Sequence, residues 1–365
     1  MAEQQVCLNH LDYSAHVGGL GEGFTQCIGH YEECRSARKD AIQMPRVHTV
    51  VRNAFCGLLA LGLIASGRVR RSRKRALGEA VVTAIYFHKP NRRLFGRCIR
   101  WLSKYGYTFI SVNELLEILY LGKVPPRGAV WLSFDDGCKE LLENVLPLVR
   151  QRKIPVTLFI PSGIVEGDGL FPWLHGMTST EMRDRNASAR KSGRDSMTVA
   201  KMRQVAGWPE VTIGSHTVSH AVMTSLKEEK ARFELGESKR TLESWTGADV
   251  KCFAFPEGRF DGREREFLVE FDYRLAATTE NSFITRGTNP YMVPRFSVAD
   301  DISFPEAICN MVGVWRPAID PLINFLQHRK DLDGEKQKSG VEPRSPCPTP
   351  RGMSQPEKVE SSSAR

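Results

Sequence analysis

Two adjacent carboxylates end an apolar run near the middle of the chain. Residues 130–134 read Val-Trp-Leu-Ser-Phe, and Asp135, Asp136 and Gly137 follow them directly. Such a run predicts a buried parallel strand that carries acids at its carboxyl end, where α/β folds keep their chemistry. Because side chains alternate along a strand, Asp135 and Asp136 cannot point the same way within it. One can bind a metal while the other contacts a water; the alternative is that the pair only begins the next helix.

Two histidines follow about eighty residues later, at the end of a second strand-like run at residues 211–215. His216 and His220 are four positions apart. If the backbone turns helical there, both imidazoles lie on one face and reach one ion at roughly 2.0–2.1 Å, the zinc–nitrogen distance. Two histidines and one aspartate leave open positions on an ion, which is typical of a catalytic site. The alternative is a pair of surface histidines at a helix start.

Together with a third motif, these residues resemble a known family. Residues 253–258 read Phe-Ala-Phe-Pro-Glu-Gly. The three motifs, in this order and spacing, are similar to those of the polysaccharide deacetylases, the NodB-homology or carbohydrate esterase family 4 domain, over roughly residues 81–298. The resemblance implies an α/β fold, a distorted (β/α) barrel. It also implies metal-dependent hydrolysis of acetyl groups, N- or O-linked, from the sugars of a polysaccharide or glycolipid.

The resemblance further implies roles for single residues. Asp135 corresponds to the base, and Asp136, His216 and His220 correspond to the ligands of a divalent metal ion. Zinc is the expected ion, with cobalt or nickel as alternatives. An ion on such ligands lowers the pKa of a water toward ~7 and polarises the acetyl carbonyl.

The chain departs from the commonest family pattern in two places. That pattern has an arginine two residues before the proline of the third motif, where this chain has Ala254. It also has a late Leu-x-x-His motif that supplies the general acid, whereas His328 is the only histidine here after His220. The chain resembles a branch with a Phe-Ala-Phe/Tyr-Pro third motif, in which a histidine ending the first strand corresponds to the acid. His88 matches that histidine and Arg295 is a candidate for the missing arginine charge; the alternative for each is a structural residue.

Two functions are open on this basis, a carbohydrate deacetylase and a catalytically weakened, metal-containing carbohydrate-binding domain. The missing late histidine allows the second, but Asp135 favours the enzyme because a binding domain needs no base beside Asp136. The formal net charge of +9 suggests attraction to an anionic glycan, lipid head group or nucleic acid. A nucleic-acid partner does not explain the acid and histidine motifs. We therefore expect an acetylated glycan or glycolipid and no nucleic acid.

The elements around the motifs alternate between strands and helices. This order predicts βαβ units and a parallel sheet. Ser225 and Glu228 fit a capping box at the start of a helix that closes at Gly247. Trp173, in the segment before the histidine motif, is a candidate for stacking on a sugar ring. Strands are expected at residues 80–88, 130–134, 156–161, 211–215, 252–255, 274–278 and 292–298, and helices at 94–105, 114–121, 141–149 and 225–245.

Three segments divide the chain. Residues 1–78 are expected to be an irregular N-terminal extension with a short apolar segment, 54–66, and a basic cluster, 68–75. Residues 79–328 form the deacetylase-like domain. Residues 329–365 are rich in Pro, Ser, Lys and Glu and are expected to be a disordered tail. The nine cysteines form no C-x-x-C pair, which indicates mostly reduced thiols and no zinc ribbon.

The apolar segment 54–66 has three interpretations: an interfacial or buried amphipathic helix, an export signal or short anchor, and a plain loop. Its uncharged stretch spans about 22 Å as a helix, against a hydrocarbon core of ~30 Å. The basic cluster that follows opposes export of the domain. Membrane association through residues 54–75 or export is thus one hypothesis for its localisation, and a cytoplasmic protein is the other.

Overall fold

The computed structural model describes residues 46–171 and 194–321. The described residues up to Pro317 belong to one compact unit. Trp173, His328 and the tail 329–365 lie outside the described residues. One curled sheet organises the unit, with strand order β7-β6-β5-β4-β3-β1-β8 and β2 paired to β3. Each of these strand pairs is parallel.

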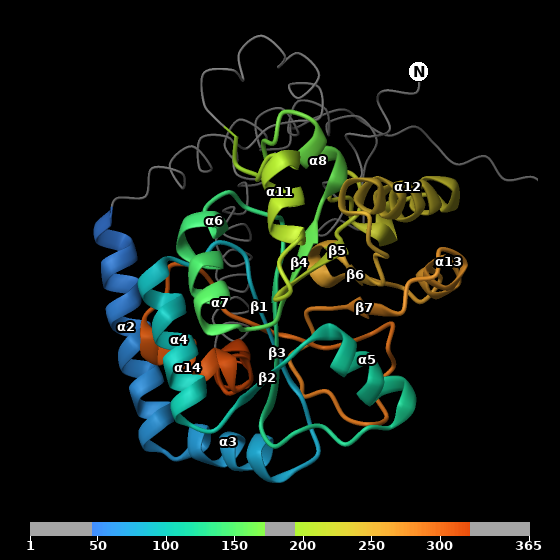
Figure 1. Cartoon of the computed structure of the whole chain (residues 1–365). Helices are drawn as coiled ribbons and strands as arrows, with labels where there is room; N and C mark the ends of the chain where they lie inside the picture. The colour runs from blue at the N-terminus through green and yellow to red at the C-terminus, as the bar shows by residue number, and fades with distance from the viewer. Residues whose placement is uncertain (1–45, 172–193, 322–365) are drawn as a thin grey trace, which may run out of the picture. The chain divides into compact units, whose positions relative to one another are not determined.

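The strands lie at the predicted positions, and most are shorter, except for β2, which was not among the predicted strands. Helices cover the outside of the sheet (Figure 1), which is the distorted (β/α) barrel that was expected. The strands are β1 (Thr83–Phe87), β2 (Thr108–Ile110), β3 (Ala129–Phe134), β4 (Val156–Ile160), β5 (Val211–Ser215), β6 (Cys252–Ala254), β7 (Leu275–Ala277) and β8 (Phe296–Ser297).

The helix predicted at residues 141–149 is divided into two, α6 and α7. Pro147 separates α6 from α7, because its ring does not fit a helix interior but does fit a first turn. The helices are α2 (Arg46–Ala65), α3 (Arg68–Gly78), α4 (Arg92–Lys104), α5 (Val112–Leu121), α6 (Leu141–Asn144), α7 (Leu146–Arg152), α8 (Ser162–Glu166), α11 (Val199–Ala206), α12 (Glu228–Thr246), α13 (Glu264–Glu270) and α14 (Phe304–Met311).

The predicted capping box at the start of α12 is wrong. Ser225 belongs to a short 3₁₀ turn, and its hydroxyl donates to the carbonyl of Val222 instead of accepting from the helix. The residue that precedes the helix is Lys227, which makes no side-chain cap. The C-terminal end is as predicted, since Gly247 ends the helix in the left-handed conformation at φ 65°.

The predicted last strand is divided between two neighbours. Val293 forms a parallel bridge with Ala277 of β7, whereas Phe296 and Ser297 pair with β1. The segment therefore bridges β7, at one end of the strand order, to β1 near the other end and closes the barrel. Arg295 lies between the two pairings, at this seam.

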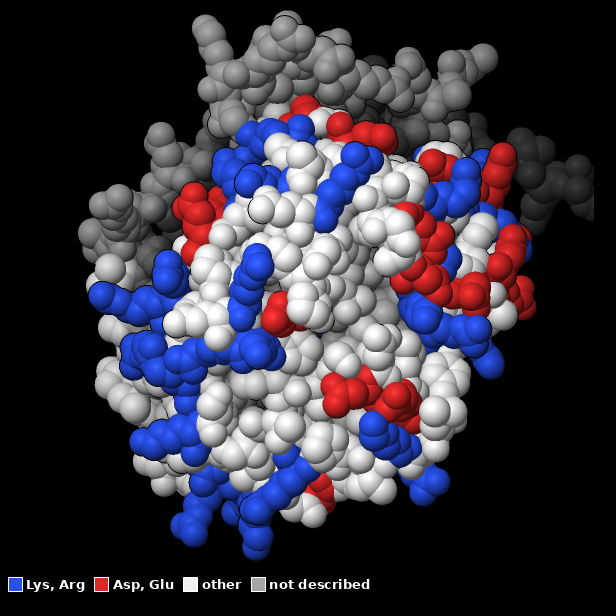
Figure 2. Space-filling model, in the orientation of Figure 1, with Lys and Arg blue, Asp and Glu red and all other residues white. Residues whose placement is uncertain are grey.

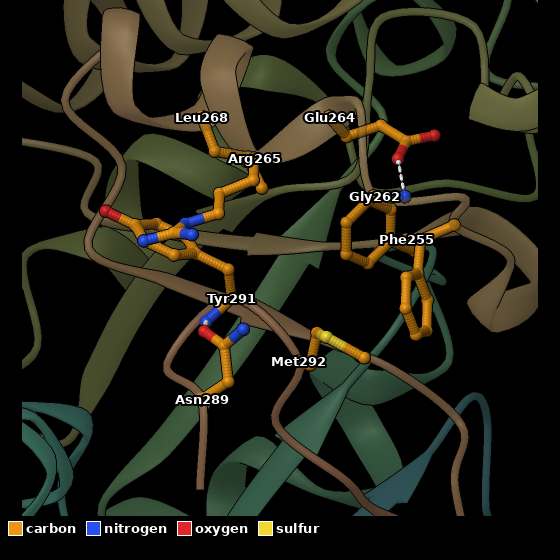
Figure 3. Close-up of a pocket in the computed structure, with 9 residues that line it drawn as sticks. Phe255, Gly262, Glu264, Arg265, Leu268, Asn289, Tyr291 and Met292 are labelled. Atoms are coloured by element: carbon orange, nitrogen blue, oxygen red, sulfur yellow. Dashed lines mark hydrogen bonds between the residues drawn. The ribbon is translucent and has the colours of Figure 1, made fainter.

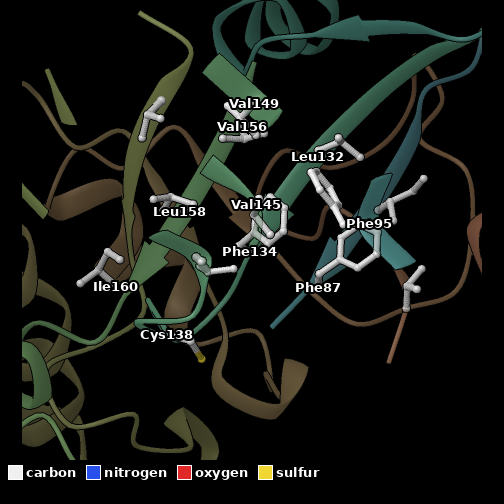
Figure 4. Close-up of a cluster of buried hydrophobic side chains, with 14 of the residues drawn as sticks. Phe87, Phe95, Leu132, Phe134, Cys138, Val145, Val149, Val156, Leu158 and Ile160 are labelled. Atoms are coloured by element: carbon white, nitrogen blue, oxygen red, sulfur yellow. The ribbon is translucent and has the colours of Figure 1, made fainter. Parts of the chain in front are cut away.

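Two hydrophobic clusters fill the two sides of the sheet. Inside the curl, Trp131, Phe159 and Ala254 pack together, and the buried face of α5 adds Leu115 and Ile118. Outside the curl, the side chains on the other face of the strands pack against the helices that cover the sheet. Figure 4 shows this outer cluster, including Phe87, Phe95, Phe134, Val145 and Leu158.

Residues 46–78 are helical, so the prediction of an irregular segment is wrong for this part of the extension. α2 packs on α14, where the buried Cys309 thiol donates to the carbonyl of Ala60 at 3.6 Å and Arg52 pairs with Glu306 at 2.7 Å. Among the described helices, none is long and apolar enough by itself to cross a membrane. Residues 50–65 and 68–78 pass that test only as a pair, bent by 62°.

Candidate active site

The carboxyl ends of three strands bring the motif residues together. β1, β3 and β5 are followed directly by His88, Asp135 and His216. Phe87 pairs with Phe134 in the register of β1 and β3, so His88 and Asp135 leave the sheet side by side. Carboxyl ends of parallel strands share one edge of a barrel. This edge is the expected place for chemistry in such a fold.

Asp136, His216 and His220 form a cluster that fits a metal ion. The Asp136 Oδ1 atom lies 3.6 Å from His216 Nε2 and 3.5 Å from His220 Nε2. One potential ligand atom from each residue lies within 4.8 Å of the others. Two atoms each bound at roughly 2.1 Å to one ion are at most about 4.2 Å apart, so both distances to the carboxylate fit. Asp136 Oδ1 is buried and has no hydrogen-bond partner, which an ion would supply.

A tight turn, not a helix, holds the two histidines. Thr217 and His220 are in the left-handed region, at φ 66° and 58°, so the helical geometry expected from their spacing is wrong. Asp136 is left-handed as well, at φ 71°. Non-glycine residues in this region cost energy and persist where surrounding contacts determine them. The ligand cluster is thus built on three strained backbone positions.

The imidazole of His216 has a fixed orientation. Its Nδ1 atom lies 2.8 Å from the carbonyl oxygen of Ala254, the last residue of β6. A carbonyl only accepts, so Nδ1 carries the proton and Nε2 keeps its lone pair toward Asp136. This is the usual arrangement of a histidine ligand whose second nitrogen is held by the backbone. The third motif therefore contributes through its backbone at Ala254.

Arg295 holds Asp135 from the barrel interior. Both residues are buried, and the guanidinium donates to the two carboxylate oxygens at 2.8 and 2.9 Å. The same guanidinium donates to Ser133 Oγ and to the carbonyl of Thr278, each at 3.0 Å. The guanidinium carbon, Cζ, lies 4.3 Å from the ring centre of Tyr86. The structure thus brings Arg295 to the carboxylate next to the metal cluster.

The two aspartates have opposite pKa shifts. Burial alone would raise the pKa of Asp135, but the charge and hydrogen bonds of Arg295 act against it and the pKa is lowered. Burial raises the pKa of Asp136, against the opposing effect of His88 and His216. Burial also lowers the pKa of His220 well below its usual value, and His216 adds to this. Asp135 is therefore held as a carboxylate and His220 as a neutral imidazole.

His88 lies at the opening of this arrangement. It is partly exposed, and its ring contacts Tyr86 edge to face at 5.6 Å between centres. When protonated, His88 acts to lower the pKa of three nearby carboxyl groups, those of Asp135, Asp136 and Asp300. The Asp300 carboxylate also accepts the Lys89 backbone N–H at 2.8 Å. The structure thus collects all six sequence-predicted site residues at one edge of the barrel.

Comparison with known proteins identifies the family. Residues 122–276 match the family described as polysaccharide deacetylase. The chain contains a polysaccharide deacetylase domain. The matched residues include Asp135, Asp136, His216 and His220, whereas His88 and Arg295 lie on either side of the match.

The alignments with relatives cover about three fifths of this chain and most of each relative. Over 236 residues the chain is 25% identical to the poly-beta-1,6-N-acetyl-D-glucosamine N-deacetylase of Staphylococcus aureus strain MSSA476, with 60% of this chain and 73% of that protein covered. Two solved structures share the fold. The Streptococcus pyogenes deacetylase PplD has a TM-score of 0.52 and 17% identity, covering 63% of this chain and 98% of that one. IcaB from Ammonifex degensii has a TM-score of 0.51 and 18% identity, covering 64% and 98%.

These findings confirm the predicted family, the barrel fold and the class of carbohydrate deacetylases. They do not test the roles of single residues. Trp173 and His328, which the sequence singled out, lie outside the described part of the deacetylase domain.

Sequence reasoning missed one residue that shapes the site. Glu234 of α12 is buried, and its carboxylate accepts from the backbone N–H groups of Val218 and Ser219 at 2.8 and 2.9 Å. It also accepts from the Ser219 hydroxyl at 2.8 Å. Glu234 therefore binds the turn between the two histidines. No signal in the sequence marks it, because it is one of several glutamates along a charged helix.

A small pocket lies beside the third motif but is separate from the metal cluster. Phe255, Met292 and Tyr291 line it together with residues of α13 (Figure 3). Glu264 at its rim accepts from the backbone N–H of Gly262 at 3.1 Å. The pocket lining includes none of the six predicted site residues. We assign this pocket no part in the chemistry.

Proposed function

We propose that the domain hydrolyses the N-acetyl group of an N-acetylglucosamine-containing glycan, with a divalent ion held by Asp136, His216 and His220. The observation that carries the proposal is the cluster of these ligand atoms beside Asp135, a carboxylate held by Arg295. The substrate class is that named for the S. aureus relative. An amide-bound acetyl group is therefore preferred to an ester-bound one.

The proposed chemistry uses each carboxylate differently. A divalent ion, when bound, lowers the pKa of a water toward ~7 and polarises the acetyl carbonyl. Asp135 takes the proton of the attacking water, and each of its oxygens keeps a second lone pair beyond the bond to Arg295. Arg295 keeps this base deprotonated and fixes its plane. Asp136 acts as ligand because its Oδ1 atom faces both histidines.

His88 is the proposed acid. Collapse of the tetrahedral species releases an amine, which needs a proton to leave. His88 lies beside Asp135 at the open edge of the barrel and is partly exposed, so a glycan can reach it. An imidazole can carry a proton on a ring nitrogen and donate it to the leaving amine.

The test is acetate release by the full chain from a panel of acetylated sugars. We expect acetate and an equal amount of free amine from β-1,6-linked N-acetylglucosamine oligomers, loss of both with chelator, and recovery with Zn²⁺ or Co²⁺. Acetate from O-acetylated sugars alone would replace the proposal by an esterase. Oligomer binding by the metal-loaded protein without acetate release would favour the carbohydrate-binding alternative.

A further inference from the structure

The outer face of α2 is apolar and exposed. Five of the ten large hydrophobic side chains that are exposed within the described residues lie on this one helix. Their three- and four-residue spacing places them on one side of it. Exposed apolar residues that gather on one face mark interaction surfaces, whereas scattered ones do not. We call this surface the α2 face: Val50, Val51, Phe55, Leu58 and Leu61, which are 66, 62, 60, 69 and 50% exposed.

The opposite side of α2 is fixed to the domain. Gly57 and Ala60 are buried, and a Cβ added at Gly57 would lie 3.3 Å from Ser303 Oγ. Cys309 and Glu306 of α14 bond to Ala60 and Arg52 of α2. α2 therefore cannot rotate to bury its apolar face within the domain. Among the described residues, none covers that face.

A strongly basic helix continues from the α2 face. Residues 46–78 contain eight lysines and arginines and no acidic residue. Within the described residues, no ion pair involves Arg68, Arg70, Arg71 or Lys74 of α3, and all four are exposed. In Figure 2 the charged side chains at the lower left margin, where α2 and α3 lie in Figure 1, are mostly blue, and most of the red side chains lie farther to the right.

We propose that α2 and α3 dock the protein on the surface of an anionic lipid bilayer. The α2 face enters the boundary between head groups and acyl chains, and the basic residues of α3 contact lipid phosphates. Apolar burial combined with attraction to anionic head groups is how interfacial helices bind. The helices lie on the bilayer and do not cross it, because α2 is held by α14 on its other side and α3 carries exposed charges.

A second copy of the chain fits the same face less well. A twofold interface places the same surface patch on both partners. Two α2 faces paired in parallel would bring two basic α3 helices together, and like charges across an interface oppose association. Paired antiparallel, they would offer the basic residues no acidic partner from residues 46–78, which contain no acidic residue. A lipid surface offers the opposite charge. This inference is independent of the deacetylase activity.

The test is co-sedimentation of the full chain with phosphatidylcholine vesicles, with and without phosphatidylglycerol. We expect binding to the anionic vesicles that weakens as salt is raised. Phe55→Ser with Leu58→Ser should lower the partition coefficient about tenfold or more, because both apolar side chains leave the boundary layer. Arg70→Glu with Arg71→Glu should abolish the preference for anionic vesicles.

A matched control uses equally exposed apolar residues elsewhere. Leu121→Ser with Val124→Ser removes side chains that are 79 and 75% exposed and should leave binding unchanged. Thermal unfolding of each variant shows whether it folds. Absence of binding to anionic vesicles, or equal binding by all folded variants, would overturn the proposal. The proposal would also be overturned if the protein bound no vesicles but formed a dimer in sedimentation equilibrium, and if Phe55→Ser with Leu58→Ser was the only variant that dissociated this dimer.

Discussion

Asp135 and Asp136 are neighbours in the sequence, yet their carboxyl groups meet different surroundings. Asp135 points into the barrel, where Arg295 donates to both of its oxygens. Asp136 turns through a left-handed backbone toward the two histidines and leaves Oδ1 without a hydrogen bond. A pair of titratable groups with opposite pKa shifts is a pattern of divided roles in active sites. One carboxylate is suited to accept a proton, the other to bind an ion.

At the residue scale, Arg295 can be tested by Arg295→Met. Without the guanidinium, burial raises the pKa of Asp135, so the acidic limb of the pH–rate profile should move to higher pH. Breaking a buried pair costs about 3–5 kcal/mol of stability. Since the paired carboxylate has a lowered pKa in the folded protein, this cost applies at neutral pH. It should shrink as pH falls through the folded pKa of Asp135.

The control for this variant is Arg259→Met, which removes an exposed arginine paired with the exposed Glu257. It should change neither the pH profile nor the unfolding temperature measurably. An unchanged acidic limb in Arg295→Met would contradict the role given to the buried guanidinium.

His88 is the second residue to test. His88→Ala should leave metal content and unfolding temperature close to wild type, because His88 is partly exposed and is not one of the three clustered ligands. The value of kcat should fall by about 10²–10⁴ for loss of a general acid, and the alkaline limb of the pH–rate profile should disappear. Retention of that limb would assign the acid to another group.

At the element scale, the turn from Thr217 to His220 was the part least accessible from the sequence. The four-residue spacing predicted a helical face, but two left-handed residues and Glu234 produce the same convergence in a turn. A spacing rule cannot separate these cases, because the deciding contact comes from Glu234 in the next helix, α12, outside the His-x-x-x-His motif. The strand ends, by contrast, were predictable because an apolar run followed by a polar residue marks them locally.

Glu234→Gln tests whether this contact positions the ligands. The amide oxygen can still accept from both backbone N–H groups of the turn, but it lacks the negative charge that strengthens these hydrogen bonds. We expect zinc affinity to fall by about 10–100-fold, as for other supports of metal ligands. Calorimetric titration with Zn²⁺ measures this directly. The control Glu228→Gln, with a 66% exposed side chain on the same helix, should bind as wild type.

At the scale of the whole molecule, closure of the barrel completes the candidate site. The segment from Val293 to Ser297 bridges β7 to β1 and delivers Arg295 to Asp135, a residue 160 positions away in the sequence. The sequence predicted a last strand there, and it predicted Arg295 as a replacement for the missing arginine charge of the third motif. It did not predict that one end of this segment pairs with β7 and the other with β1. That pairing depends on how far the sheet curls, which no local pattern records. The parallel sheet followed from the alternation of strands and helices, and the barrel class followed from the resemblance to the polysaccharide deacetylases.

The central claim is that Asp136 holds the ion while Asp135 does the proton transfer. The most direct measurement determines bound zinc and acetate release from N-acetylglucosamine oligomers on the same samples of wild type, Asp136→Ala and Asp135→Asn. We predict that Asp136→Ala loses zinc and activity together. Asp135→Asn should retain zinc while kcat falls by about 10²–10⁴. Zinc loss in Asp135→Asn, or full activity in zinc-free Asp136→Ala, would contradict the account.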